Sequence, residues 1–158
     1  MTVLSDAIRA KIVDACGRYP NKQAVTLPAL HWVQQEQGCV SKEAIEGIAE
    51  LLDLSAAQVI DTMTFYGFFK DEKHPLGRRR IWVCRSLSCM LRGGDGLLAE
   101  VCQRLGVQPG QTTADGGATI ELAECLGACD GAPCILIDDS LSLHATADQV
   151  VQLAKEPS

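Results

Sequence analysis

Apolar residues between positions 3 and 65 recur at spacings of three and four, which is the pattern of amphipathic helices. The first predicted helix covers residues 3–19, and Pro20 is expected to end it, because the residue before a proline is disfavoured in the helical conformation. The apolar stripe of this helix consists of Leu4, Ile8, Ile12, Ala15, Cys16 and Tyr19.

Further helices are predicted along the same part of the chain. One begins near Leu27 and stops at Gly38, and the next is capped by Ser41 and runs through Leu52. Ser55 followed by Gln58 is a capping-box pattern that opens another helix. Together these elements predict a small helical bundle over residues 1–70.

Beyond a polar linker at residues 71–77, the pattern changes to short apolar runs separated by turns. Strands are predicted at residues 80–83, 119–122, 134–137 and 141–143, with helices at 95–105 and from Thr146 onward. The order β-α-β-β-β-α with a terminal hairpin resembles a thioredoxin-like domain over residues 78–158. The predicted fold class is therefore α+β, a helical bundle followed by a thioredoxin-like α/β domain.

Four aromatic residues, Phe65, Tyr66, Phe68 and Phe69, stand together before the linker. They either close the core of the bundle or form, in part, an exposed docking surface for a partner. The basic run Arg78–Arg80 is expected to be a solvated approach to the first strand, with contact to an acidic partner as the alternative.

Composition narrows the function. The chain is 47% hydrophobic and 22% charged, which supports a buried core, and its net charge of −6 argues against a nucleic-acid surface. No apolar run approaches the roughly 18–20 residues of a membrane span, and no basic segment with an apolar core opens the chain. We therefore expect a cytosolic protein without direct membrane insertion, where grouped cysteines indicate metal or redox chemistry.

Two cysteine pairs carry the candidate chemistry. Cys84 and Cys89 follow the first predicted strand, and Cys125 and Cys129 follow the second. Four thiolates can bind zinc tetrahedrally or hold an iron–sulfur cluster, and ordinary thiols are a third interpretation. No Cys-x-x-Cys redox motif is present, and spacing alone leaves these interpretations open.

The other cysteines are assigned to packing. Cys16 and Cys102 lie on the apolar stripes of predicted helices, and Cys39 follows a helix-ending glycine. Cys134 opens a predicted strand and is expected to be a core residue beside the metal centre, with a role as spare ligand as the less favoured alternative.

Several of these motifs resemble one family, the thioredoxin-like [2Fe–2S] ferredoxin component of complex I, which is the E subunit of bacterial NADH–quinone oxidoreductase. The resemblance covers nearly the whole chain and rests on Leu27-Pro28-Ala-Leu30, Gln35-Glu36-x-Gly38, Thr64-Phe65-Tyr66, Val-Cys84-x4-Cys89, Thr113-Ala-Asp115-Gly116 and Glu124-Cys125-Leu-Gly-Ala-Cys129-Asp-Gly-Ala-Pro133. One departure is Cys39, where the family usually has an aromatic residue, and it affects only local packing.

The resemblance implies that Cys84, Cys89, Cys125 and Cys129 ligate one [2Fe–2S] cluster that exchanges single electrons with the FMN of a partner. That partner would be the flavin- and NADH-binding F-type subunit of complex I, and the chain would be non-catalytic alone. Residues 1–70 are expected to dock this partner, and the complex would hold the chain at the inner membrane from the cytoplasmic side. An NAD-reducing hydrogenase, an NAD-dependent formate dehydrogenase and a zinc-stapled interaction module remain as alternatives.

Overall fold

The computed structural model describes residues 4–156 and divides the chain into two compact units, residues 1–75 and 76–158. Each unit has a hydrophobic core of its own. The linker predicted at residues 71–77 lies across this division. Within the described residues, no helix is long and apolar enough to cross a membrane.

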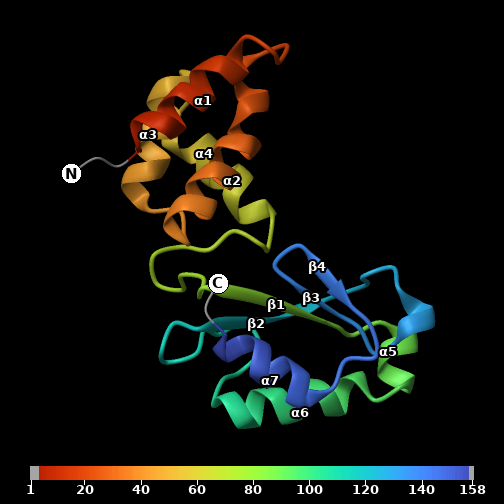
Figure 1. The fold of residues 1–158 in the computed structure, drawn as a ribbon. Helices are drawn as coiled ribbons and strands as arrows, with labels where there is room; N and C mark the ends of the chain where they lie inside the picture. The colour runs from red at the N-terminus through yellow and green to blue at the C-terminus, as the bar shows by residue number, and fades with distance from the viewer. Residues whose placement is uncertain (1–3, 157–158) are drawn as a thin grey trace. The chain divides into compact units, whose positions relative to one another are not determined.

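The N-terminal unit is entirely helical (Figure 1). Its elements are α1 (Asp6–Cys16), a 3-10 helix η1 (Lys22–Val25), α2 (Thr26–Gln37), α3 (Lys42–Leu52) and α4 (Ala56–Phe65). Helix α1 is shorter than the sequence predicted, because it ends at Cys16 with Gly17 as its C-cap. Residue 3, where the predicted helix begins, lies outside the described residues.

Side-chain caps fix where these helices begin. The hydroxyl of Ser41 accepts the backbone N–H of Ala44 at the start of α3. Ser55 and Gln58 form the predicted capping box at the start of α4, in which each side chain accepts the backbone N–H of the other. The apolar stripes of the helices meet in one core, so local capping and packing agree.

The aromatic segment after α4 divides between core and surface. Phe69 is buried, and Tyr66 and Phe68 pack partly buried against the core of the N-terminal unit. The ring of His31 stacks on Phe68 with a centroid separation of 5.1 Å. Phe65, in contrast, is 80% exposed. Packing and exposure, the two interpretations of the sequence, therefore apply to different rings of the same segment.

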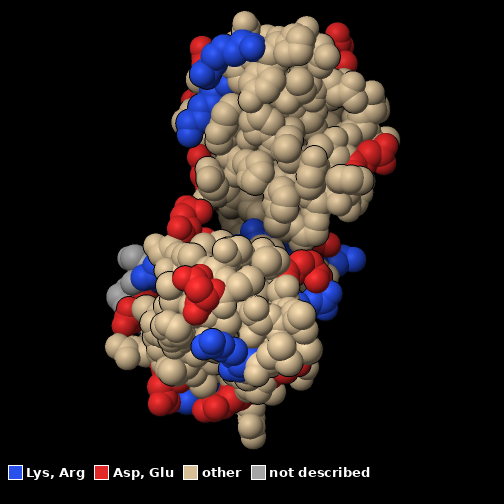
Figure 2. Space-filling view, turned by 90° about the vertical axis from the view of Figure 1, so that its right-hand side faces the viewer, with Lys and Arg blue, Asp and Glu red and all other residues tan. Residues whose placement is uncertain are grey.

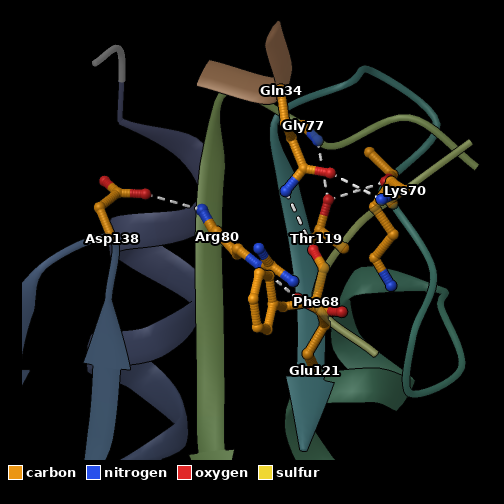
Figure 3. Close-up of polar contacts among 9 residues, drawn as sticks. Gln34, Phe68, Lys70, Gly77, Arg80, Thr119, Glu121 and Asp138 are labelled. Atoms are coloured by element: carbon orange, nitrogen blue, oxygen red, sulfur yellow. Dashed lines mark hydrogen bonds and ion pairs between the residues drawn. The ribbon is translucent and has the colours of Figure 1, made fainter. Parts of the chain in front are cut away.

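Buried Gln34 holds this segment against α2 (Figure 3). Its Nε2 donates to the carbonyl of Phe68 at 3.0 Å, and its Oε1 accepts the backbone N–H of Lys70 at 2.6 Å. One amide side chain thus pairs backbone groups of a segment without regular structure, which is how such a segment tolerates burial.

The C-terminal unit contains a four-stranded sheet of order β2-β1-β3-β4. Strand β1 (Arg79–Cys84) is parallel to β2 (Ala118–Ala123) and antiparallel to β3 (Ile135–Ile137), which forms a hairpin with β4 (Ser140–Ser142). Helices α6 (Gly94–Leu105) and α7 (Ala147–Lys155) cover one face of the sheet (Figure 1). This arrangement confirms the predicted α+β fold class.

Side chains of β1 alternate between the two faces of the sheet. Ile81 and Val83 are buried in the core that includes α6 and α7, whereas Arg80 and Trp82 point to the other face. There the guanidinium of Arg80 pairs with Glu121, whose side chain is 6% exposed, and lies 4.4 Å from the ring centroid of Trp82 (Figure 3).

The basic run before the first strand is therefore paired inside the chain rather than simply solvated. Arg79 pairs with Asp138 at 3.0 Å, and Arg78 lies 3.9 Å from Asp115. The β1–β2 register and the β3–β4 turn bring these carboxylates to the arginines, which local sequence does not reveal.

Replacing Glu121 with Gln should lower the free energy of unfolding by about 3 kcal/mol, because it removes the charge that compensates a largely buried guanidinium. Urea denaturation followed by far-UV circular dichroism measures this loss. Glu100→Ala, which removes a half-exposed carboxylate beside Arg104 in the same unit, should leave the midpoint unchanged. Equal effects of both substitutions would contradict a special role for the buried pair.

Candidate metal centre

The first cysteine pair is built by the end of β1 and a short helix, α5 (Leu87–Leu91), at that end of the sheet (Figure 1). Cys84 is the last residue of β1, and Cys89 lies within α5. Both side chains are buried, at 3% and 1% exposure. Helix α5 was not predicted, although Ser86 before the run Leu87–Leu91 is a residue type that favours a helix N-cap.

Gly94 allows α5 and the start of α6 to pack closely. A Cβ at this position would lie 2.8 Å from the carbonyl oxygen of Cys89 and 3.3 Å from that of Cys84. Both of these neighbours are backbone atoms, so a side chain at position 94 would have to displace the segment that carries the thiols. The absence of a Cβ at Gly94 thus helps to set the position of Cys89.

The second cysteine pair lies in the exposed segment after β2. Cys125 follows the strand, and Cys129 opens the 3-10 helix η2 (Cys129–Gly131). Both thiols are exposed. The loop bends at Gly127, which has φ of +75° and whose N–H donates to the sulfur of Cys125 at 3.4 Å.

A backbone hydrogen bond links the two pairs. The N–H of Leu126, next to Cys125, donates to the sulfur of Cys84, as does the N–H of Ser86. The parallel register also sets Cys84 opposite Ala123, so both pairs leave the sheet at the same end. The structure thus brings the loop of Cys125 and Cys129 to the buried pair.

Cys134 joins the buried pair more closely than its place in the sequence predicted. It precedes β3 and lies beside Cys84 across the β1–β3 ladder, where the N–H of Cys84 donates to the Cys134 carbonyl at 3.2 Å. Its sulfur is 3.6 Å from that of Cys89, and the sulfurs of Cys84, Cys89 and Cys134 all lie within 4.8 Å of one another. Cys125 and Cys129 do not belong to this group of three.

The three buried thiols differ in acidity. Burial raises the pKa of Cys84, but hydrogen bonds from two backbone N–H groups and from the thiols of Cys89 and Cys134 outweigh it, so this pKa lies below its ordinary value. Burial raises the pKa of Cys89. Burial and the contact with Cys89 raise the pKa of Cys134 to about 12. Cys84 is therefore the best thiolate of the three.

Small residues around the second pair have separate roles. Gly127 supplies the bend and an N–H directed at sulfur, as expected from sequence. Gly131 instead makes room for a side chain, because a Cβ there would lie 2.7 Å from Leu143. Outside the centre, Cys102 is buried and Cys16 and Cys39 are half-buried, in agreement with their assignment to packing.

The residues present fit an iron–sulfur cluster. Four cysteine thiols leave the sheet at one end, and backbone N–H groups point at the sulfurs of Cys84, Cys89 and Cys125. The unit has an aliphatic core of its own, so it does not need a structural metal to replace one. The fold and the donor set define a thioredoxin-like iron–sulfur protein.

Comparison with known proteins gives the family. The family model of the thioredoxin-like [2Fe–2S] ferredoxins matches residues 12–157. This chain belongs to that family, which confirms the resemblance drawn from its cysteine motifs.

Two curated relatives are components of NADH-quinone oxidoreductase. The E subunit of this enzyme from Pseudomonas aeruginosa is 37% identical over 151 residues, covering 96% of this chain and 90% of that protein. The second E subunit of the enzyme from Rhizobium meliloti is 37% identical over 132 residues, covering 84% of this chain and 77% of that protein.

A solved structure shares the fold. A chain of an NAD+-reducing [NiFe]-hydrogenase in the H2-reduced state superposes with a TM-score of 0.68 at 25% sequence identity. The match covers 84% of this chain but only 23% of the hydrogenase chain, so the shared fold is a minor part of that larger chain.

Replacing Gly94 with Ala should destabilise the metal centre, because the added Cβ meets the backbone of Cys89 and Cys84. We expect the free energy of unfolding to fall by about 1–3 kcal/mol, with less iron bound per chain. Thermal denaturation and iron analysis measure the two effects.

Gly96→Ala in the same helix is the matched control, since no atom lies within 4 Å of a Cβ there. This variant should keep its iron and gain up to about 1 kcal/mol from helix propensity. Full iron content in Gly94→Ala would contradict the role assigned to the close approach.

Proposed function

We propose that this chain is the electron-transfer subunit of an NADH-oxidising complex, with one [2Fe–2S] cluster ligated by Cys84, Cys89, Cys125 and Cys129. The observation that carries the proposal is the hydrogen bond from the N–H of Leu126 to the sulfur of Cys84, since it joins the second pair to the first. The relatives from NADH-quinone oxidoreductase support the same assignment.

The chain's own residues suit an electron carrier. Cys84 and Cys89 would hold the inner side of the cluster in the protein, where backbone N–H groups stabilise the charge on sulfur. Cys125 and Cys129 are exposed and would place its outer side at the surface, within reach of a redox partner. A [2Fe–2S] cluster supplies one-electron transfer when bound, and these residues position it for that exchange.

The partner we propose is the flavin- and NADH-binding F-type subunit of complex I. This chain contains no glycine-rich phosphate loop of its own, so the nucleotide and flavin chemistry is assigned to that partner. Complex I would then hold the chain at the cytoplasmic side of the inner membrane, as a peripheral component.

We further propose that the N-terminal unit docks this partner. Phe65, at the end of α4, leaves a large aromatic ring in solvent, and aromatic rings dominate the binding energy of many interfaces. Figure 2 shows, in its upper part, a broad face of this unit on which charged side chains lie toward the margins. Such a face suits a protein interface, whose centre is depleted in charge.

The alternative assignments differ from this one in what they predict. The hydrogenase chain that shares this fold supports a related role in an NAD+-reducing hydrogenase. Identification of the proteins that co-purify with the native chain separates that assembly, and an NAD-dependent formate dehydrogenase, from complex I. A zinc-stapled interaction module would give a colourless protein with one zinc ion instead of iron and acid-labile sulfide.

Replacing Cys125 with Ser should abolish or strongly perturb the cluster, whereas Cys134→Ser should keep its EPR signal. Serine replaces a ligand in the first variant and a neighbouring thiol in the second. Visible absorption, EPR of the reduced protein and analysis of iron and sulfide measure the outcome. The reverse result would show that the ligand assignment is wrong.

Replacing Phe65 with Ala should weaken binding to the flavin-bearing subunit about tenfold, because a buried aromatic contact of an interface is worth more than about 1 kcal/mol. Val13→Ala is the control, since Val13 on α1 is also exposed, at 62%, but is not aromatic. Calorimetric titration with the isolated partner measures both affinities. Unchanged binding of the Phe65 variant would argue against docking through this residue.

A further inference from the structure

Cys84, Cys89 and Cys134 form a compact group of buried thiols, of which the proposed function uses only two. Their sulfurs all lie within 4.8 Å of one another, and none of the three side chains is more than 3% exposed. Cys125 and Cys129, which would complete the cluster, are exposed in the loop after β2.

Regular structure holds the group in place. Cys84 and Cys134 face each other across the β1–β3 ladder through the backbone hydrogen bond between them. The close approach at Gly94 positions α5, which supplies Cys89. The three thiols are therefore brought together by the sheet and the helix packing, without a contribution from the thiols of the second pair.

The spacing of the sulfurs suits a single metal ion. In tetrahedral zinc–thiolate sites, with Zn–S bonds of about 2.3 Å, neighbouring sulfurs lie about 3.8 Å apart. The Cys89–Cys134 separation of 3.6 Å is close to this value, and the remaining separations exceed it by at most about 1 Å, within reach of small side-chain rotations.

We propose that Cys84, Cys89 and Cys134 bind one thiophilic divalent cation, such as Zn2+, when the chain carries no iron–sulfur cluster. The three thiols ligate through sulfur and release their protons to solvent, which leaves one net negative charge on the site. Backbone N–H groups of Ser86 and Leu126 point at Cys84, and that of Cys134 points at Cys89, and these dipoles offset the charge.

This site and the cluster exclude each other, because Cys84 and Cys89 belong to both ligand sets. The exclusion rests on the proposed function, whereas the binding of the cation does not. A chain loaded with the divalent ion is therefore expected to resist cluster assembly until the ion is removed. Cys134 decides which soft ion the cluster-free chain retains, although it takes no part in holding the cluster.

The test uses the full chain, with its cluster removed, and Cd2+ as a spectroscopic substitute for Zn2+. Titration followed by thiolate-to-cadmium absorption in the ultraviolet gives the stoichiometry and, with a competing chelator, the affinity. Three variants are compared with the unchanged chain: Cys134→Ala, the double variant Cys125→Ala with Cys129→Ala, and Cys102→Ala, which alters a buried thiol outside the group.

We expect one Cd2+ per chain, and Cys134→Ala should lower the affinity at least about tenfold and remove about one third of the thiolate absorption. The double variant and Cys102→Ala should bind like the unchanged chain. Unchanged affinity in Cys134→Ala would overturn the proposal, whatever the loop variant does.

Cluster reconstitution in the same variants keeps this result separate from the proposed function. A [2Fe–2S] spectrum in Cys134→Ala shows that this variant folds and that the four-cysteine ligand set does not need Cys134. Loss of that spectrum would overturn the ligand set of the proposed function instead.

Discussion

The structure of the metal centre depends on the pairing of β1 with a strand on each side. Parallel pairing with β2 brings the ends of both strands, and the cysteine pairs that follow them, to one end of the sheet. Antiparallel pairing with β3 brings Cys134 beside Cys84. A register shift of one residue would turn these side chains to the opposite face, so the buried core and the metal centre require the same register.

Close backbone approach then converts this placement into a site for sulfur ligands. Gly94 lets α6 reach the carbonyl groups of Cys84 and Cys89, and the loop of the second pair directs the N–H of Leu126 at the sulfur of Cys84. The backbone hydrogen bonds help to lower the pKa of Cys84 although the side chain is buried. The site therefore combines burial with stabilisation of a thiolate.

Much of the fold could be predicted from the sequence, because helix caps and apolar periodicity are local. The capping box of Ser55 and the β3–β4 hairpin are examples. Helix α5 was missed, since a five-residue helix is too short for a periodic pattern. The pairing of Arg80 with Glu121 and the proximity of Cys134 to Cys89 were also missed, because they depend on strand register and on packing between distant segments.

The position of Cys134 shows why a cysteine motif does not by itself define a ligand set. Four cysteines lie at motif spacings, yet the sulfurs that the folded chain holds closest together include one that the motif leaves out. A cluster with two iron atoms needs thiolates spread around it, whereas a single ion needs three or four at separations of about 3.8 Å. The same residues therefore present two overlapping sites, and the size of the inorganic group determines which thiols it can use.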